Sequence, residues 1–227
     1  MGLSPQDLRL RVGDFLRRPG AAVLLDLDGT LVDSEPMQRA AFHSYFRSRG
    51  WDVPDDVVRE FMGRRGHESF ALIDGPWRGE DPVALTEGVI AHVDPRTTPP
   101  VAVPGAAGAI RGWRAAGTPV CLVTSAFRMW AEQALELLGV ADLGLRLVTA
   151  EDTPVGKPDP APFRLGAERL GVAPADCLAA EDSVAGLTAA RGAGVGFAVG
   201  VTTSLPAEVL LAAGADAAVP DLTPLAP

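Results

Sequence analysis

Two aspartates one residue apart follow an apolar stretch of strand length and could bind a metal ion. Residues 21–25 are Ala-Ala-Val-Leu-Leu, Asp26 comes next, and Asp28 precedes a Gly-Thr pair. Residues two apart on a strand face the same side, so both carboxylates are expected to leave the end of a buried strand as neighbours. Their mutual repulsion would be relieved by a divalent cation that prefers oxygen ligands, above all Mg²⁺. The alternative interpretation is an ordinary Asp-Gly turn.

Three further predicted strands also end in polar residues. These residues are Thr124 and Ser125 after residues 120–123, Lys157 in the loop after residues 146–149, and Glu181 and Asp182 after residues 177–180. In a parallel sheet the carboxyl ends of all strands lie at one edge, so the four groups are expected to converge there. Taken singly, each has a plainer interpretation as a helix cap, a surface lysine or a charge at the rim.

The converging groups are of the types that phosphoryl transfer needs. Asp26, the deepest, is predicted to attack phosphorus and form an aspartyl-phosphate. Asp28 is predicted to protonate the leaving alkoxide and then to accept the proton of the attacking water. With these two residues, Thr124 and Lys157 complete the predicted catalytic set.

The same groups predict a metal site and a phosphate site. Oxygen ligands favour Mg²⁺, while a cation and hydrogen-bond donors stabilise the charge on a phosphoryl group. The predicted Mg²⁺ ligands are Asp26, Asp28, Asp182 and Glu181. The predicted phosphate-binding residues are Thr124, Ser125, Lys157 and Gly29.

Predicted elements alternate after residue 105. Apolar spacing predicts strands at residues 120–123, 146–149, 177–180, 196–199 and 217–219, and helices at 106–116, 127–138, 162–170, 184–193 and 206–213. This alternation indicates an α/β fold with a parallel sheet covered by helices on both faces. A further short helix is predicted to begin at Ser4-Pro5 and to end at Pro19-Gly20.

Residues 35–100 have a different character from the rest of the chain. Their apolar residues recur at helical spacing without a convincing strand, and residues 97–105 have the composition of a stiff linker. We therefore predict a core domain formed by residues 1–34 and 104–227, and a small helical domain formed by residues 35–103.

Composition and net charge argue against some classes of partner and indicate the cellular compartment. The chain has 227 residues, 47% of them hydrophobic, and its 20 Lys and Arg against 29 Asp and Glu leave a net charge of −9. Nucleic acid and anionic membranes need basic surface, so neither is expected as a partner. Cys121 and Cys177 each lie in an apolar run, which predicts reduced core thiols and a cytoplasmic protein. No signal-peptide pattern or membrane-length apolar run is found.

The four polar segments resemble, in order, the motifs of the haloacid dehalogenase-like (HAD) superfamily, in its branch with a helical cap after the first motif. Residues 26–36, 156–160 and 181–186 are especially similar to its sugar-phosphate phosphatases and β-phosphoglucomutases. The resemblance spans residues 21–222 and implies a Rossmann-like core, Mg²⁺, Asp26 as nucleophile and Asp28 as acid and base. It also implies that Asp28 binds the metal through its carbonyl. Dehalogenases lack the second aspartate, so a phosphate ester is the expected substrate.

The segment around Gly63 is the place where this resemblance implies substrate selection. Arg64, Arg65 and His67 lie there between and beside two glycines, which are expected to leave the loop free to move. We predict that these residues contact the substrate; a solvated charge cluster is the alternative.

A Mg²⁺-dependent phosphatase of sugar or polyol phosphates is the function predicted. The alternatives are a β-phosphoglucomutase-like mutase and a non-catalytic module that binds phosphorylated metabolites. Mutases carry a histidine where this chain has Gln38, an arginine where it has Gly66, and a Lys-Asn pair where residues 126–128 are Ala-Phe-Arg. The sequence does not distinguish a monomer from a homodimer.

Overall fold

A six-stranded parallel sheet forms the centre of the computed structural model, which describes residues 5–227. The strand order is β5-β4-β1-β6-β7-β8. The strands are β1 (Ala22–Leu25), β4 (Val120–Val123), β5 (Arg146–Val148), β6 (Cys177–Glu181), β7 (Phe197–Val201) and β8 (Ala217–Val219). The predicted α/β class with a Rossmann-like parallel sheet is confirmed.

Strand β1 lies between β4 and β6, and both of its faces are buried. Val23 is in register with Val120 and Leu178, and it belongs with Leu25 to one hydrophobic core. Ala22 and Leu24 belong to the core on the opposite face. A strand buried on both faces is apolar at every position, which explains the unbroken apolar stretch before Asp26.

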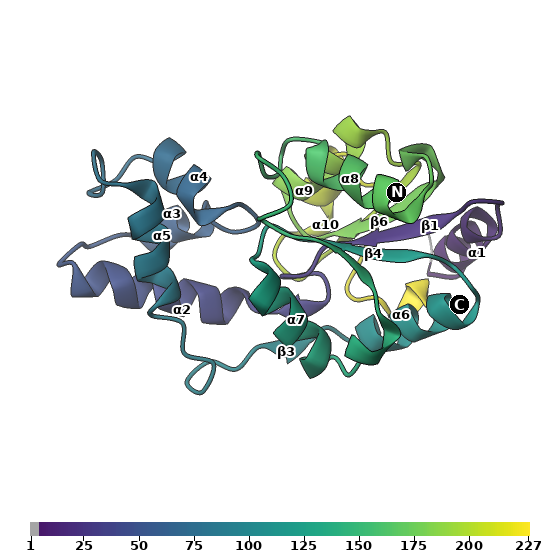
Figure 1. Cartoon of the computed structure of the whole chain (residues 1–227), viewed down its shortest axis with the longest axis horizontal. Coiled ribbons are helices and arrows are strands. Elements are labelled where there is room, and N and C mark those ends of the chain that lie inside the picture. The colour runs from purple at the N-terminus through teal and green to yellow at the C-terminus, as the bar shows by residue number, and fades with distance from the viewer. Residues whose placement is uncertain (1–4) are drawn as a thin grey trace.

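Helices cover both faces of the sheet (Figure 1). One face carries α1 (Pro5–Leu16), α6 (Ala106–Ala115) and α7 (Arg128–Leu137). The other carries α8 (Ala161–Leu170), α9 (Val184–Ala193) and α10 (Ala207–Ala212). Short 3-10 helices occupy Ala141–Leu143, Pro174–Asp176 and Thr223–Leu225. The predicted first helix ends at Leu16 rather than Pro19, and its expected cap, Ser4, lies outside the described residues.

Four helices form a separate body beside the sheet, at the left of Figure 1. They are α2 (Glu35–Ser48), α3 (Asp55–Arg59), α4 (Gly66–Leu72) and α5 (Pro82–Ile90), and we call residues 35–90 the helical segment. Its hydrophobic core is its own and is largely aromatic: the rings of Phe46 and Trp77, for example, stack with their centres 5.1 Å apart.

The connection between the helical segment and the sheet contains a pair of short strands. Strand β2 (Val32–Asp33) pairs antiparallel with β3 (Val101–Ala102). The predicted stiff linker over residues 97–105 thus contains one of these strands, β3, which the sequence analysis did not predict. Two-residue strands are too short to show an alternating pattern, so periodicity could not reveal this pair.

Both cysteines are buried and free, as the apolar runs around them predict. Burial raises the pKa of the Cys121 and Cys177 thiols to about 12, which keeps them protonated and unreactive. Among residues 5–227, no helix is both long and apolar enough to cross a membrane.

Candidate active site

Three carboxylates gather at the carboxyl ends of the neighbouring strands β1 and β6. Asp26 follows β1, Glu181 is the last residue of β6, and Asp182 comes next. One carboxylate oxygen of each lies within 4.8 Å of the others, and the side chains are buried. The register explains the proximity: Leu25 lies opposite Ala180, so the residues that follow them meet at the sheet edge.

Lys157 reaches this cluster from the loop between β5 and α8. Its Nζ donates to Asp26 Oδ1 at 2.5 Å and to Glu181 Oε1 at 2.7 Å. The side chain is only 1% exposed, so the plainer interpretation as a solvated lysine is wrong. Sequence separations of 131 and 24 residues thus become direct contacts.

Burial dominates the electrostatics of the cluster. It raises the pKa of Asp26 to about 7, although the Lys157 ammonium acts in the opposite direction. Burial and the neighbouring carboxylates also raise the pKa of Asp182 well above its usual range. Burial lowers the pKa of Lys157, but Asp26 and Glu181 outweigh this and leave it raised. Three carboxylates with one ammonium therefore leave room for further positive charge.

The carboxylate oxygens that accept no hydrogen bond could bind a divalent cation. Asp26 Oδ2 and Asp182 Oδ1 accept no hydrogen bond from the described residues, while Asp182 Oδ2 accepts one from Ser204 Oγ at 2.5 Å. Both oxygens of Glu181 are engaged, Oε1 by Lys157 and Oε2 by the backbone N–H of Ser183 at 2.7 Å and its Oγ at 2.9 Å. The free oxygens of the two aspartates are thus the available anionic ligands, and Glu181 holds Lys157 beside them.

The Asp28 carboxylate lies outside this acidic group and is held separately. Its Oδ1 accepts hydrogen bonds from Ser34 Oγ at 2.5 Å, Gln38 Nε2 at 2.8 Å and Trp130 Nε1 at 2.9 Å. Removal from water raises the pKa of Asp28, and these donors oppose that rise. Sequence reasoning missed Ser34 and Trp130 as partners and noted Gln38 only as a replacement for histidine.

Gly29 allows the chain to turn beneath Asp182. Its φ of +85° is in the left-handed region, and a Cβ at this position would overlap the Asp182 carboxylate. Gly29, predicted to bind phosphate, is therefore placed at the acidic cluster by the turn itself.

Thr124 and Ser125 lie where β4 ends. The Thr124 side chain is buried, and its Oγ1 accepts a hydrogen bond from the Ala126 N–H at 3.0 Å. Ser125 Oγ donates to the carbonyl of Gly63 at 3.3 Å, which joins the sheet edge to the helical segment.

The cap of α9 is Ser183, whose Oγ accepts from the Gly186 N–H at 3.0 Å. The plainer interpretation of Asp182 as a helix cap is therefore wrong.

Arg65 does not lie on a freely moving loop. It is 4% exposed, and its guanidinium donates to Thr153 O at 2.9 Å and to Thr153 Oγ1 at 2.5 Å. The expectation that it faces substrate is corrected by these contacts, which join it to the core. Arg64 and His67 are half-buried.

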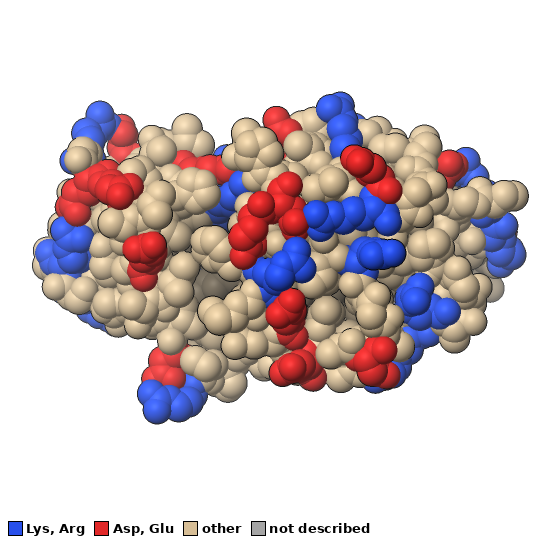
Figure 2. All heavy atoms as spheres, viewed as in Figure 1, with Lys and Arg blue, Asp and Glu red and all other residues tan. Residues whose placement is uncertain are grey.

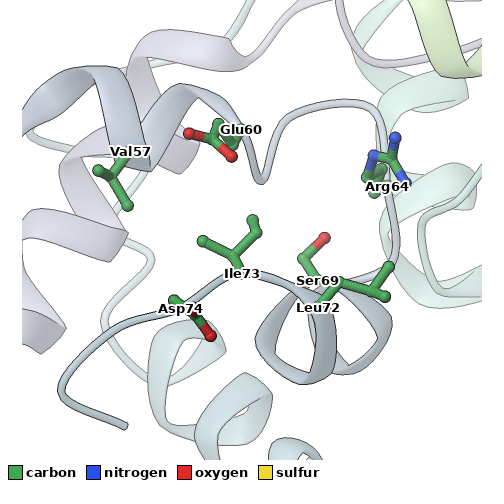
Figure 3. Close-up of a pocket in the computed structure, with 7 residues that line it drawn as sticks. All are labelled: Val57, Glu60, Arg64, Ser69, Leu72, Ile73 and Asp74. Atoms are coloured by element: carbon green, nitrogen blue, oxygen red, sulfur yellow. The ribbon is translucent and has the colours of Figure 1, made fainter. Parts of the chain in front are cut away.

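Arg64 lines two cavities. One, of about 200 Å³, lies between the helical segment and the acidic cluster and is lined by Gly63, Arg64, Asp182 and Ser204 among others. The other, of about 610 Å³, lies within the helical segment between α3 and α4 (Figure 3). Figure 3 shows Arg64 on the loop that closes one side of this second cavity, with Glu60 across from α4.

Charge on the molecular surface is mixed. Figure 2 shows acidic and basic side chains lying next to one another on the displayed face. The net charge of −9 thus coexists with basic groups in the middle of that face.

Comparisons with known proteins agree with this geometry. A model of the haloacid dehalogenase-like hydrolases matches residues 21–194. Validoxylamine A 7'-phosphate phosphatase from Streptomyces hygroscopicus subsp. limoneus is 38% identical over 88% of this chain and 93% of its own. Hexitol phosphatase A from Escherichia coli K12 is 33% identical over 75% of this chain and 78% of its own. A hydrolase from Pseudomonas syringae shares the fold, with a TM-score of 0.80 at 24% identity over 90% of this chain and 95% of that one. The chain is a member of the haloacid dehalogenase-like hydrolase family.

Proposed function

We propose that the chain is a Mg²⁺-dependent phosphatase of sugar or polyol phosphates that works through an aspartyl-phosphate. The observation that carries the proposal is the buried contact of Lys157 with Asp26, beside an Asp28 whose carboxylate is held apart by its own donors. The names of the relatives support the substrate class, because hexitol and validoxylamine phosphates are small phosphorylated metabolites.

The proposed reaction has two displacements. A carboxylate oxygen of Asp26 attacks phosphorus, the bond from phosphorus to the ester oxygen breaks, and Asp28 gives its proton to that oxygen. Water then attacks the aspartyl-phosphate and transfers a proton to Asp28, which releases phosphate and restores Asp26. Lys157 and the Thr124 loop are proposed to balance the charge of the phosphoryl oxygens. The metal would supply further positive charge beside these oxygens, held by Asp26, Asp182 and the Asp28 carbonyl.

Mg²⁺ is expected to stabilise the folded protein as well as to support activity. An ion that binds only the native state at about 100 times its Kd contributes ~2.7 kcal/mol, which raises Tm by about 5–10 °C for a chain of this size. Differential scanning fluorimetry with MgCl₂, against KCl of equal ionic strength, measures the shift. Asp182→Asn keeps the size of the side chain and should reduce the shift. An equal shift in this variant, or full activity in excess EDTA, would contradict the metal site.

The helical segment is proposed to act as a cap that selects substrate. Residues 35–103 would form this cap, and Gly63 packs so close to the core that a Cβ there would lie 2.9 Å from Ser183 Cβ. Arg64 lines both cavities, so we propose that it contacts the part of the substrate that carries no phosphate. His67 lies in the first turn of α4 and lines neither of these cavities, which leaves Arg64 as the better supported of the two.

Phosphate release from a panel of esters tests the proposed function. The panel contains sugar, polyol and nucleotide phosphates, phosphoglycolate and nitrophenyl phosphate, each with Mg²⁺. We expect inorganic phosphate from hexose or polyol phosphates and no interconversion of glucose 1-phosphate with glucose 6-phosphate. Faster isomerisation than phosphate release, after priming with a bisphosphate, would favour the mutase. Binding of esters without release of phosphate would favour the non-catalytic module.

A further inference from the structure

Residues 63–68, which run from the loop before α4 into its first turn, contact three of the four chain segments that build the site. We call them the 63–68 segment. Its contacts to the core are Gly63 with Ser125 and Ser183, Arg65 with Thr153, and Glu68 with Gly156. Two of these contacts fall on Thr153 and Gly156, which lie four residues and one residue before Lys157. The 63–68 segment is therefore placed to influence the catalytic lysine without touching it.

The guanidinium of Arg65 is buried where a charge is costly. It lies 3.6 Å from Glu68, the carboxylate that balances it, and its Nε has no hydrogen-bond partner among the described residues. A buried charge persists only where its partners are well placed, so the two bonds to Thr153 and the ion pair must fix its position. The contact between Arg65 and Thr153 is thus held in one defined geometry.

Gly156 forms a second contact between the core and the 63–68 segment. Its N–H donates to Glu68 Oε1 at 2.8 Å. A Cβ at Gly156 would lie 2.8 Å from Arg65 Nε, so the arginine packs directly against the backbone at this point. Arg65 and Glu68 together hold the chain at residue 153 and at residue 156, one peptide bond before Lys157.

We infer that Arg65 is a positioning residue for Lys157: with Glu68 it holds residues 153–156 so that the ammonium group lies between Asp26 and Glu181. This inference rests on the proposed function. Lysine has a long flexible side chain, and its Nζ is kept in place by two short contacts that depend on where the backbone of residue 157 lies. Without Arg65, Thr153 loses both of its hydrogen bonds to the helical segment, and Glu68, which holds the Gly156 N–H, loses the cation that it pairs with. The backbone before Lys157 is then held less firmly, and the ammonium group is displaced from the phosphoryl site.

Kinetics with two esters separate positioning from substrate contact. Arg65→Ala should lower kcat about 10- to 100-fold, because a displacement of about 1 Å in a catalytic group has an effect of this size. The factor should be equal for nitrophenyl phosphate and for the best sugar phosphate, since Lys157 acts on the phosphoryl group that both share. Arg65→Lys, which can still donate to the Thr153 carbonyl, should recover part of the loss. Arg64→Ala should instead have an effect that depends on the ester.

Control variants address stability. Arg78→Ala removes an exposed arginine of the same segment whose partner, Asp74, is also in that segment, so kcat should not change. If Arg65→Ala does not fold, Thr153→Val removes the hydroxyl that accepts from Arg65 and donates to the Val155 carbonyl, and it should also lower kcat because both bonds hold residues 153–156. An unchanged kcat in a folded Arg65→Ala variant, or a loss that follows the hydroxyl groups of the ester, would overturn the inference.

Hydrogen exchange supplies a readout that does not require activity. In the wild-type protein the Gly156 N–H donates to Glu68 Oε1, the same oxygen that pairs with Arg65 at 3.6 Å. Loss of Arg65 frees this carboxylate to move, so Arg65→Ala should speed exchange of the Gly156 N–H at least about 10-fold, while Arg78→Ala should not. Unchanged exchange at Gly156 would overturn the inference. If the wild-type protein releases no phosphate from any ester, the proposed function fails, and the exchange result still decides whether Arg65 positions this backbone.

Discussion

Asp26→Asn should abolish turnover and leave the fold intact. An amide is not a nucleophile toward phosphorus, so kcat is expected to fall by ~10⁴-fold or more. The two side chains have the same shape, and Lys157 keeps its contact with Glu181. The substitution also removes one of three mutually repelling carboxylates, so Tm should stay within about 5 °C of the wild-type value. Phosphate release and thermal unfolding measure the two expectations.

Asp33→Asn is the matched control for this experiment. It makes the same chemical change in the same stretch of chain, but the Asp33 side chain is exposed on β2. Its kcat should equal that of the wild-type protein. Asp26→Asn with more than about 1% of wild-type activity would contradict the role of Asp26 as nucleophile. A phosphorylated protein trapped by acid quench from the wild type, and absent from the variant, would identify the intermediate.

The strands at the centre of the sheet could be predicted because β1, β4 and β6 are buried along their whole length and are therefore apolar at nearly every position. The predicted boundaries for β4, β8 and α9 match those of the structure, and the other elements after residue 105 differ by one or two residues at most ends. The exceptions are the β2 and β3 strands, whose pairing depends on residues almost 70 positions apart. Local patterns carry no information about such a pair, because its stability comes from the register of distant segments.

The site was predictable where topology alone brings residues together. Parallel strands place Asp26 and Asp182 at one edge whatever the side-chain details. The partners of Asp28 were not predictable. Trp130 lies 102 positions away, and in the sequence it is one apolar residue of a predicted helix, with nothing that indicates a contact with Asp28. The prediction that Arg65 lies on a mobile loop and faces the substrate failed for a related reason. Flanking glycines indicate freedom of the backbone, but the burial of its guanidinium depends on Thr153, 88 positions away.

Asp28→Asn should separate the two roles proposed for Asp28. The amide oxygen can still accept the hydrogen bonds from Ser34, Gln38 and Trp130, so the side chain should keep its place. The amide can neither donate a proton to an alkoxide nor accept one from water. For a sugar phosphate, whose leaving group needs protonation, kcat should fall about 10²–10⁴-fold.

Nitrophenyl phosphate should behave differently with the same variant. Nitrophenolate leaves without a proton, so the first displacement stays fast, whereas attack of water on the aspartyl-phosphate still lacks its base. Stopped-flow absorbance should therefore show a burst of about one nitrophenolate per active site, followed by slow turnover. The wild-type protein, measured under the same conditions, provides the control. Equal losses on both esters with no burst would remove Asp28 from the role of general acid, because a missing acid must affect the poorer leaving group more.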